Sequence, residues 1–435
     1  MLNIFLIFIT AITVSMYYFP FAFRFMPTMV GKTIMAAIGL ALILVQWARK
    51  HQAGFDKEMY MLVIGGSLVS LISVMSAIVN HTPDYTYATY LISMAVWMSA
   101  AYLVCFIIKQ VHGYLSLQLL CNYLIGVCVG QCILAMMIEF NPLVRSFVDI
   151  IIGPQDGMEE INRLYGIGAA LDTAGVRFSA VLVMIAFVVS KLDDTIKKNY
   201  MGYYVLAFVI IAVVGNMIAR TTTVGVIVAL SYLVFTSGFY KLHIAPAQRK
   251  IWLWMGFFVF MAVLVLVYFY NVNPAIHKYT RFAFEGFFSL FEKGEWEVGS
   301  NNILKNMIVF PETFKTWIIG DGYMVNPKDI DPYFTGKMTR GYYMGTDIGY
   351  LRFLFYFGLA GLIAFSAVIY KAFRICYNRF TNQRALFVML LLINFIVWFK
   401  VSTDIFMVFA LFLMVDKEEN AAYEKRISND AATSS

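Results

Sequence analysis

Long apolar runs separated by short polar segments occupy most of the chain. Many of these runs are about 17–25 residues long, the length that an α-helix needs to cross the hydrocarbon core of a bilayer. Hydropathy therefore predicts about twelve transmembrane helices. Their approximate limits are 2–19, 29–47, 59–79, 88–108, 114–138, 174–190, 203–219, 223–240, 251–270, 347–370, 385–398 and 401–415. We interpret the chain as an all-α polytopic membrane protein.

Composition excludes a set of ordinary soluble domains. Hydrophobic residues make up 61% of the 435 residues, and charged residues only 14%. Soluble domains are about 45–50% apolar and about 25% charged, so the charges here are too few to cover a soluble surface. We predict one multi-span membrane domain, residues 1–415, followed by a polar tail, residues 416–435. A large loop at about residues 271–346 separates the ninth and tenth spans.

The distribution of basic residues predicts the orientation of the spans. Lysine and arginine gather in alternate loops, whereas the intervening short loops are poor in them, and residues 80–87 have none. Cytoplasmic loops carry such an excess, so we expect both termini in the cytoplasm and the large loop on the opposite side. The same bias explains the net charge of +7. No basic stretch is dense enough to indicate a nucleic-acid surface.

Arg220 is the most unusual basic residue, because it stands between two predicted spans with almost no loop around it. A charge at this depth costs a few kcal/mol unless it faces a polar cavity or a partner. Its guanidinium donates a rigid fork that suits phosphate oxygens, and three threonines follow it. We interpret this segment as a phosphate-holding corner; the alternative is an arginine that extends to the membrane interface.

Two further arginines stand at predicted membrane edges. Arg163 opens the glycine-rich stretch RLYGIGAALDTAGVR, where irregular backbone is tolerated if it is buried in protein or lines water. Arg352 follows Asp347 at the start of the tenth span. Their i, i+5 spacing is poor for a direct helical pair. Either both side chains line one cavity mouth, or Arg352 is neutralised structurally by Asp347 or another acid.

The large loop adds the basic candidates Lys278, Arg281 and Arg340. Asp321 and Asp347 are the acids expected to face the same space, where a carboxylate with a raised pKa suits a general base. Asp321 stands between two glycines, which makes a structural turn the favoured alternative for that residue.

Several chemistries lack their sequence signatures. The patterns GxxxxGK[ST] and HExxH do not occur, and the five histidines are not clustered. ATP hydrolysis and a metal site are therefore not expected, and no cofactor is predicted.

In their order along the chain, these residues resemble the O-antigen polymerase/ligase superfamily (Wzy-type polymerases and their ligase relatives). That family has a similar number of spans and one large periplasmic loop late in the chain. Arg163 and Gly166 match its Arg-x-x-Gly element, and Arg220 in ARTTTVG matches its arginine-containing corner. The family also has a Gly-x-Gly turn, which IIGDGYM resembles. A span that begins with two polar residues then follows in the family, and TDIGYLRFLFYFGLAGL resembles it.

The resemblance implies an enzyme of the bacterial inner membrane that polymerises undecaprenyl-pyrophosphate-linked repeat units into O-antigen or capsule at the periplasmic face. Lipid-linked glycan donor and acceptor, membrane lipid and a chain-length regulator are the implied partners. The implied catalytic residues are Arg220, Asp347 and Asp321. The implied substrate-binding residues are Arg163, Arg281, Arg340 and Arg352.

Two departures from the family pattern bear on the reaction. Many relatives carry an anion-binding arginine at a position where this chain has Asn301 and Asn302. In this chain, either Arg281 or Arg340 takes over the binding of that anion, or the function is absent. Ligases usually carry a histidine where this chain has Thr346 and Asp347, which favours a polymerase over a ligase. The rival from another class is a lipid-oligosaccharide flippase or other transporter, which would not require so long a loop.

Overall fold

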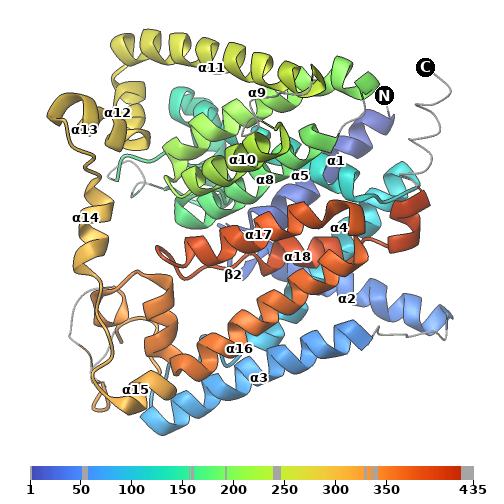
Figure 1. The fold of residues 1–435 in the computed structure, drawn as a ribbon. Helices are drawn as coiled ribbons and strands as arrows, with labels where there is room; N and C mark the ends of the chain where they lie inside the picture. Colours follow the sequence, from blue (N-terminus) through green and yellow to red (C-terminus); the bar gives the residue numbers. More distant parts are fainter. Residues whose placement is uncertain are drawn as a thin grey trace.

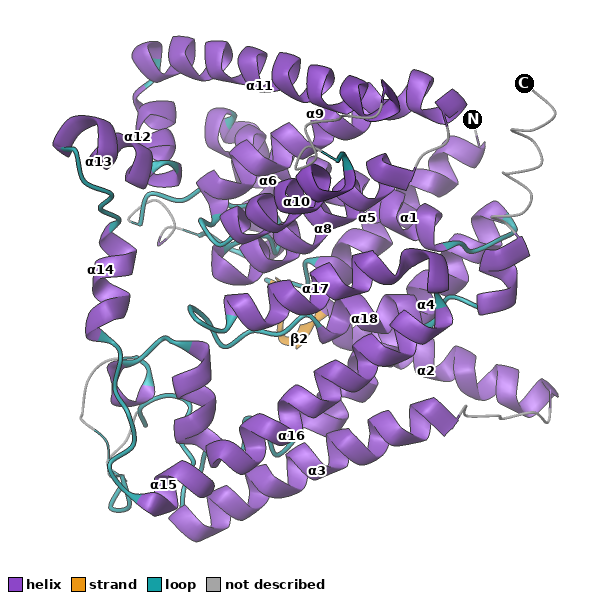
Figure 2. Ribbon diagram, viewed as in Figure 1, coloured by secondary structure: helices purple, strands orange, loops and turns teal. Residues whose placement is uncertain are grey.

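Helices make up most of the described residues. The structure is a computed structural model that describes residues 2–50, 57–155, 157, 161–191, 194–238, 246–327, 331–334, 336 and 341–422. The first helices are α1 (Leu2–Tyr18), α2 (Gly31–Lys50), α3 (Lys57–Asn80), α4 (Tyr90–His112), α5 (Leu117–Phe140), α6 (Pro142–Ile152), α8 (Leu171–Lys191), α9 (Asp194–Ile218) and α10 (Thr222–Thr236). The later ones are α11 (Pro246–Val272), α12 (Pro274–Ala283), α13 (Glu285–Lys293), α14 (Gly299–Asn306), α15 (Phe314–Ile318), η2 (Tyr343–Gly345), α16 (Gly349–Arg379), η3 (Thr381–Gln383), α17 (Arg384–Val397) and α18 (Phe406–Leu413). Figure 2 shows the one short hairpin of the described chain, in which β1 (Ala22–Phe23) pairs antiparallel with β2 (Met26–Val30).

Eight of the described helices are long and apolar enough to cross a membrane. They are α2, α3, α4, α5, α8, α9, α11 and α16. Three shorter apolar helices cover Asn3–Tyr18, Thr222–Thr236 and Thr381–Val397, and α18 has eight residues. The predicted class, an all-α membrane protein, agrees with this structure. Twelve crossings stay a prediction.

Burial divides the long helices into central and peripheral ones. In the most apolar window of α8, 83% of the residues are buried, and in that of α11 only 11%. The central helix α8 packs against α5, α9, α10 and α17, whereas α11 lies along the edge of the bundle in Figure 1. The large apolar side chains of α11 are therefore free to face lipid on most sides.

The packing of α10 against α8 fixes the short turn that carries Arg220. Gly225 allows this close approach, because a Cβ there would lie 2.2 Å from the Cα of Ser179. The Ser179 hydroxyl donates to the carbonyl of Thr221 at 3.0 Å and accepts from the Gly225 N–H at 3.1 Å. The corner at residues 219–221, here the Arg220 corner, is thus held by hydrogen bonds to a buried helix.

The first half of the predicted large loop, up to Asn306, is mostly helical. Asn273 ends α11 and begins α12, because its side chain accepts from the N–H groups of Ala275 and Ile276 while Pro274 occupies the first helical position. Helices α12, α13 and α14 form a strap (residues 274–306) that runs along one side of the molecule from the end of α11 toward α15 (Figure 1). The amphipathic segment FEGFFSLFEKGEW is helical over α13, and its position on a membrane surface stays a prediction.

Candidate functional site

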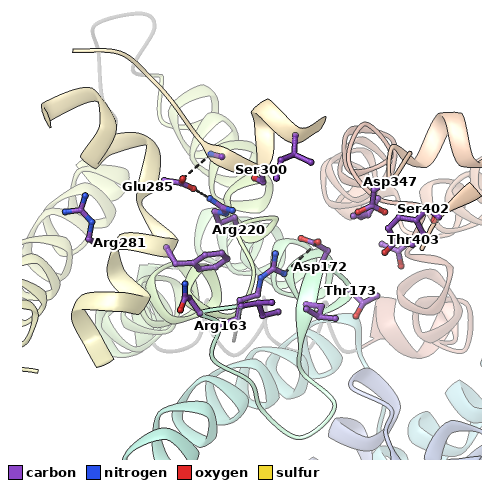
Figure 3. Close-up of a pocket in the computed structure, with 18 of the residues that line it drawn as sticks. Arg163, Asp172, Thr173, Arg220, Arg281, Glu285, Ser300, Asp347, Ser402 and Thr403 are labelled. Atoms are coloured by element: carbon purple, nitrogen blue, oxygen red, sulfur yellow. Dashed lines mark hydrogen bonds and ion pairs between the residues drawn. The ribbon is translucent and has the colours of Figure 1, made fainter. Parts of the chain in front are cut away.

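A cavity of about 1170 Å³ lies where α8 and α16 begin and α9 and α17 end. We call it the arginine cavity (Figure 3). Its lining holds five basic side chains and three carboxylates. The lining residues are Ile161, Asn162, Arg163, Leu171, Asp172, Thr173, Arg220, His277, Lys278, Arg281, Phe282, Glu285, Gly299, Ser300, Ile303, Tyr342, Asp347, Arg352, Val401, Ser402 and Thr403. Segments far apart in the sequence thus meet around one charged space.

Most of the predicted site residues line this cavity. They are Arg163, Arg220, Arg281, Asp347 and Arg352. Asp321 is not among the lining residues. Arg340, and residues 423–435 of the predicted tail, lie outside the described residues.

Arg220 is largely buried, with 16% of its side chain exposed. Its Nη1 donates to the carboxylate of Glu285, and its guanidinium lies 4.5 Å from the ring centroid of Phe282. The guanidinium of Arg163 lies 5.1 Å from the same ring, so two arginines share one aromatic side chain. The Nε of Arg220 is buried without a hydrogen-bond partner in the described structure. The side chain therefore retains donor capacity beyond its one carboxylate partner.

A second group of charges centres on Asp172, at the start of α8. Its Oδ1 lies 3.0 Å from the Nζ of Lys400, its Oδ2 lies 3.9 Å from Nη1 of Arg163, and Thr221 donates to it. Burial lowers the pKa of Arg163, and the nearby Asp172 carboxylate opposes that shift. Because Lys400 is the closer partner, Arg163 is only loosely neutralised and faces the cavity as a cation.

Asp347 and Arg352 form the third group. Nη1 of Arg352 lies 3.5 Å from Oδ1 of Asp347, and its guanidinium lies 4.0 Å from the ring centroid of Tyr342. This pair forms despite the i, i+5 spacing because Asp347 precedes α16 and is not constrained to the helix. Burial raises the pKa of Asp347 to about 6, and the Arg352 charge opposes that rise.

The strap supplies the last group. Arg281 donates from both Nη atoms to the carboxylate of Glu292, at 2.8 Å each. This hydrogen bonding raises the pKa of the exposed Arg281 guanidinium. Glu285 accepts from Arg220 and also from the Gly299 N–H at 3.0 Å. Figure 3 shows Glu285 and Arg220 facing each other while Arg281 lies farther out.

Asp321 lies elsewhere, in a buried turn against the kink of α16. Gly320 and Gly322 have positive φ angles of 82° and 77°. The carboxylate accepts from the hydroxyls of Thr316 at 2.7 Å and Tyr343 at 3.1 Å. Asp321 is 8% exposed, so the expectation that it faces the same space as Asp347 is corrected. The alternative, a structural turn, describes this residue.

Sequence reasoning missed two charged residues that line the cavity, Asp172 and Glu285, and Lys400, which pairs with Asp172. Asp172 stands inside the glycine-rich stretch that Arg163 opens, and Lys400 stands between two short apolar runs, so both carried a visible signal. Glu285 lies in an amphipathic segment with three glutamates and one lysine. Its role could not be read from the sequence, since its partner Arg220 lies 65 positions away.

A second cavity is almost entirely apolar. The apolar groove has a volume of about 470 Å³ and lies between α5, α9, α11 and α12. Apart from Asn273, which caps α12, every lining side chain is apolar. The lining residues are Met136, Phe140, Leu206, Val209, Ile210, Val213, Val214, Met217, Phe258, Met261, Ala262, Val265, Leu266, Phe269, Asn273 and Ile276.

Comparison with models of protein families, with curated proteins and with solved structures finds no match to this chain. The fold defines the class: an all-α membrane protein with a charged cavity at the ends of its buried helices. Among the described residues, no group of three or more His, Cys, Asp or Glu side chains is arranged to hold a metal ion.

Proposed function

We propose that this chain is a polysaccharide polymerase that joins glycan repeat units carried on a lipid pyrophosphate, which the family resemblance identifies as undecaprenyl pyrophosphate. The observation that carries the proposal is the arginine cavity, in which five basic side chains from separate segments converge against three carboxylates. Guanidinium groups suit pyrophosphate because they stay charged and donate paired hydrogen bonds to phosphate oxygens.

The proposed reaction is a glycosyl transfer. A hydroxyl of the acceptor glycan attacks the anomeric carbon of the donor, the bond from that carbon to the pyrophosphate oxygen breaks, and lipid pyrophosphate leaves. Arg220 and Arg163 stabilise the charge that develops on the leaving group. Asp347 accepts the hydroxyl proton, and a pKa raised to about 6 still leaves it mostly ionised near pH 7. Arg352 holds Asp347 in place.

The apolar groove supports a donor that carries a lipid chain. The linings of the groove and of the arginine cavity come close together along the chain at two places. Met217, near the end of α9, lines the groove, and Arg220, in the corner that follows α9, lines the cavity. Along α12, Ile276 lines the groove and the next residue, His277, lines the cavity. In this proposal the pyrophosphate binds the arginines while the chain extends into the groove, because apolar surface gains free energy when it leaves water.

The proposed topology has twelve crossings of the bacterial inner membrane, with both termini in the cytoplasm and the arginine cavity facing the periplasm. The positive-inside distribution of lysine and arginine supports this orientation. A reporter fused after residue 310, in the large loop, should therefore give a periplasmic signal. A cytoplasmic signal at that position would overturn both the topology and the proposed chemistry.

The function is tested by deleting the gene and analysing the glycan that remains on the lipid carrier. A polymerase defect should leave single repeat units that have reached the periplasmic face, and the wild-type chain should restore the long polymer. Accumulation of long polymer on the carrier would instead identify a ligase. Single units confined to the cytoplasmic face would identify a flippase, and either outcome would refute the polymerase.

A further inference from the structure

Arg220, the residue to which the proposed function assigns the pyrophosphate, is already paired with a carboxylate from the strap. We propose that Glu285 is a resident counter-anion of the pyrophosphate site: it competes with the donor's pyrophosphate for Arg220, and donor binding displaces it. This inference rests on the proposed function and adds a residue that controls how tightly the site holds its anion.

The position of Glu285 suits this exchange. It is the first residue of α13, and its carboxylate bonds both to Arg220 and to the N–H of Gly299, at the start of α14. One side chain therefore joins the Arg220 corner to two helices of the strap. When the carboxylate leaves Arg220, the strap loses its ion-pair contact with the corner.

Exposure distinguishes Glu285 from the other two carboxylates of the cavity. Its side chain is 40% exposed, whereas Asp172 is 20% and Asp347 is 24% exposed. Asp172 also has Lys400 and Thr221 as partners. Glu285 is thus the carboxylate that becomes solvated at the lowest cost when it leaves its arginine, because its side chain is the most exposed of the three.

Charge favours pyrophosphate in the competition. A pyrophosphate diester carries two negative charges and several acceptor oxygens, while Glu285 carries one charge. The cavity places Arg163 and other basic side chains near Arg220, so the larger anion gains contacts that the glutamate does not make. The cavity therefore binds a doubly charged ligand more tightly than it binds a carboxylate or another singly charged headgroup.

The first test measures binding of inorganic pyrophosphate to the purified full-length protein by titration calorimetry. Glu285→Gln removes the competing charge but keeps an oxygen for the Gly299 N–H, so pyrophosphate affinity should rise by about tenfold or more. The matched control is Glu297→Gln, which removes an exposed strap carboxylate that pairs with Lys293 and should change affinity by less than about twofold. Unchanged or weaker binding by Glu285→Gln would overturn the inference.

A second test uses the wild-type chain and does not depend on the folding of a variant. Hydrogen exchange is measured in peptides that cover residues 285–299, with and without saturating inorganic pyrophosphate. Displacement of Glu285 should accelerate exchange in these peptides, because α13 and α14 lose the carboxylate that joins them to the Arg220 corner. Equal or slower exchange at saturation would contradict displacement.

Arg220→Ala separates the two proposals. If this variant binds pyrophosphate as tightly as wild type, then the pyrophosphate site itself is wrong, and the role of Glu285 is wrong with it. If Arg220→Ala loses binding while Glu285→Gln shows no gain, the pyrophosphate site stands and only the counter-anion role is refuted.

Discussion

The Arg220 corner and the Asp321 turn look alike in the sequence but differ in the structure. Both place one charged residue between apolar segments. Asp321 accepts from two buried hydroxyls inside a packed turn, and its Oδ1 lies 3.5 Å from the Nζ of Lys315, so both of its oxygens have partners. Among the described residues, Arg220 has one partly exposed carboxylate partner and a buried Nε without an acceptor, and it lines a large cavity. A fully bonded buried charge stabilises the fold, whereas a charge with remaining donors beside a cavity is a candidate for binding a ligand.

The largest effect is expected for Arg220→Ala. Removing a preorganised donor to a developing charge costs about 100- to 1000-fold in rate. Long-chain polysaccharide should disappear while the amount of protein in the membrane stays unchanged, as checked by gel analysis of the glycan and by immunoblot. A normal distribution of chain lengths would show that the corner is not part of the site.

Asp347→Asn should reduce kcat/KM by about 100-fold, the lower range for loss of a general base. In the wild type, the raised pKa means that Asp347 is protonated below about pH 6 and can no longer accept a proton. Activity should therefore fall as pH drops through about 6. The Asp347→Asn variant should not show this loss of activity at acidic pH. If it does, the loss is due to the protonation of another group.

Arg220→Lys should be impaired by about tenfold, a smaller loss than with alanine. Lysine keeps the charge but loses the planar fork that bonds two phosphate oxygens at once. Rates for the alanine, lysine and wild-type forms are compared at equal protein amounts. Full activity of the lysine form would indicate that a point charge is sufficient at this position.

The smallest effect on activity is expected at the other turn. Asp321→Ala removes the carboxylate that accepts from the hydroxyls of Thr316 and Tyr343 and pairs with Lys315, at a cost of about 1–3 kcal/mol in stability. Thermal unfolding in detergent should occur several degrees lower, while activity per folded molecule stays within about twofold of wild type. A loss of activity in fully folded protein would return Asp321 to the list of catalytic residues.

The sequence was sufficient to predict the class of fold and the Arg220 corner, for identifiable physical reasons. Apolar runs of bilayer length predict helices almost independently of tertiary contacts. Arg220 stood out because a charge is costly between two spans. The sequence could not separate Asp321 from Asp347, because their difference lies in partners such as Tyr343 that only the folded chain brings near. Glu285 pairs with Arg220, 65 positions away, and Asp172 pairs with Lys400, 228 positions away, so these two contacts also required the structure.

The central claim is that the arginine cavity carries out glycan polymerisation on a lipid pyrophosphate. Its most direct test is to supply purified protein in lipid vesicles with lipid-pyrophosphate-linked repeat units and to resolve the products by length. Wild type and Asp321→Ala should produce a ladder of polymers with release of lipid pyrophosphate, and Arg220→Ala should leave single repeat units. Single units after incubation with active, folded wild-type protein, or an equal ladder from Arg220→Ala, would contradict the account.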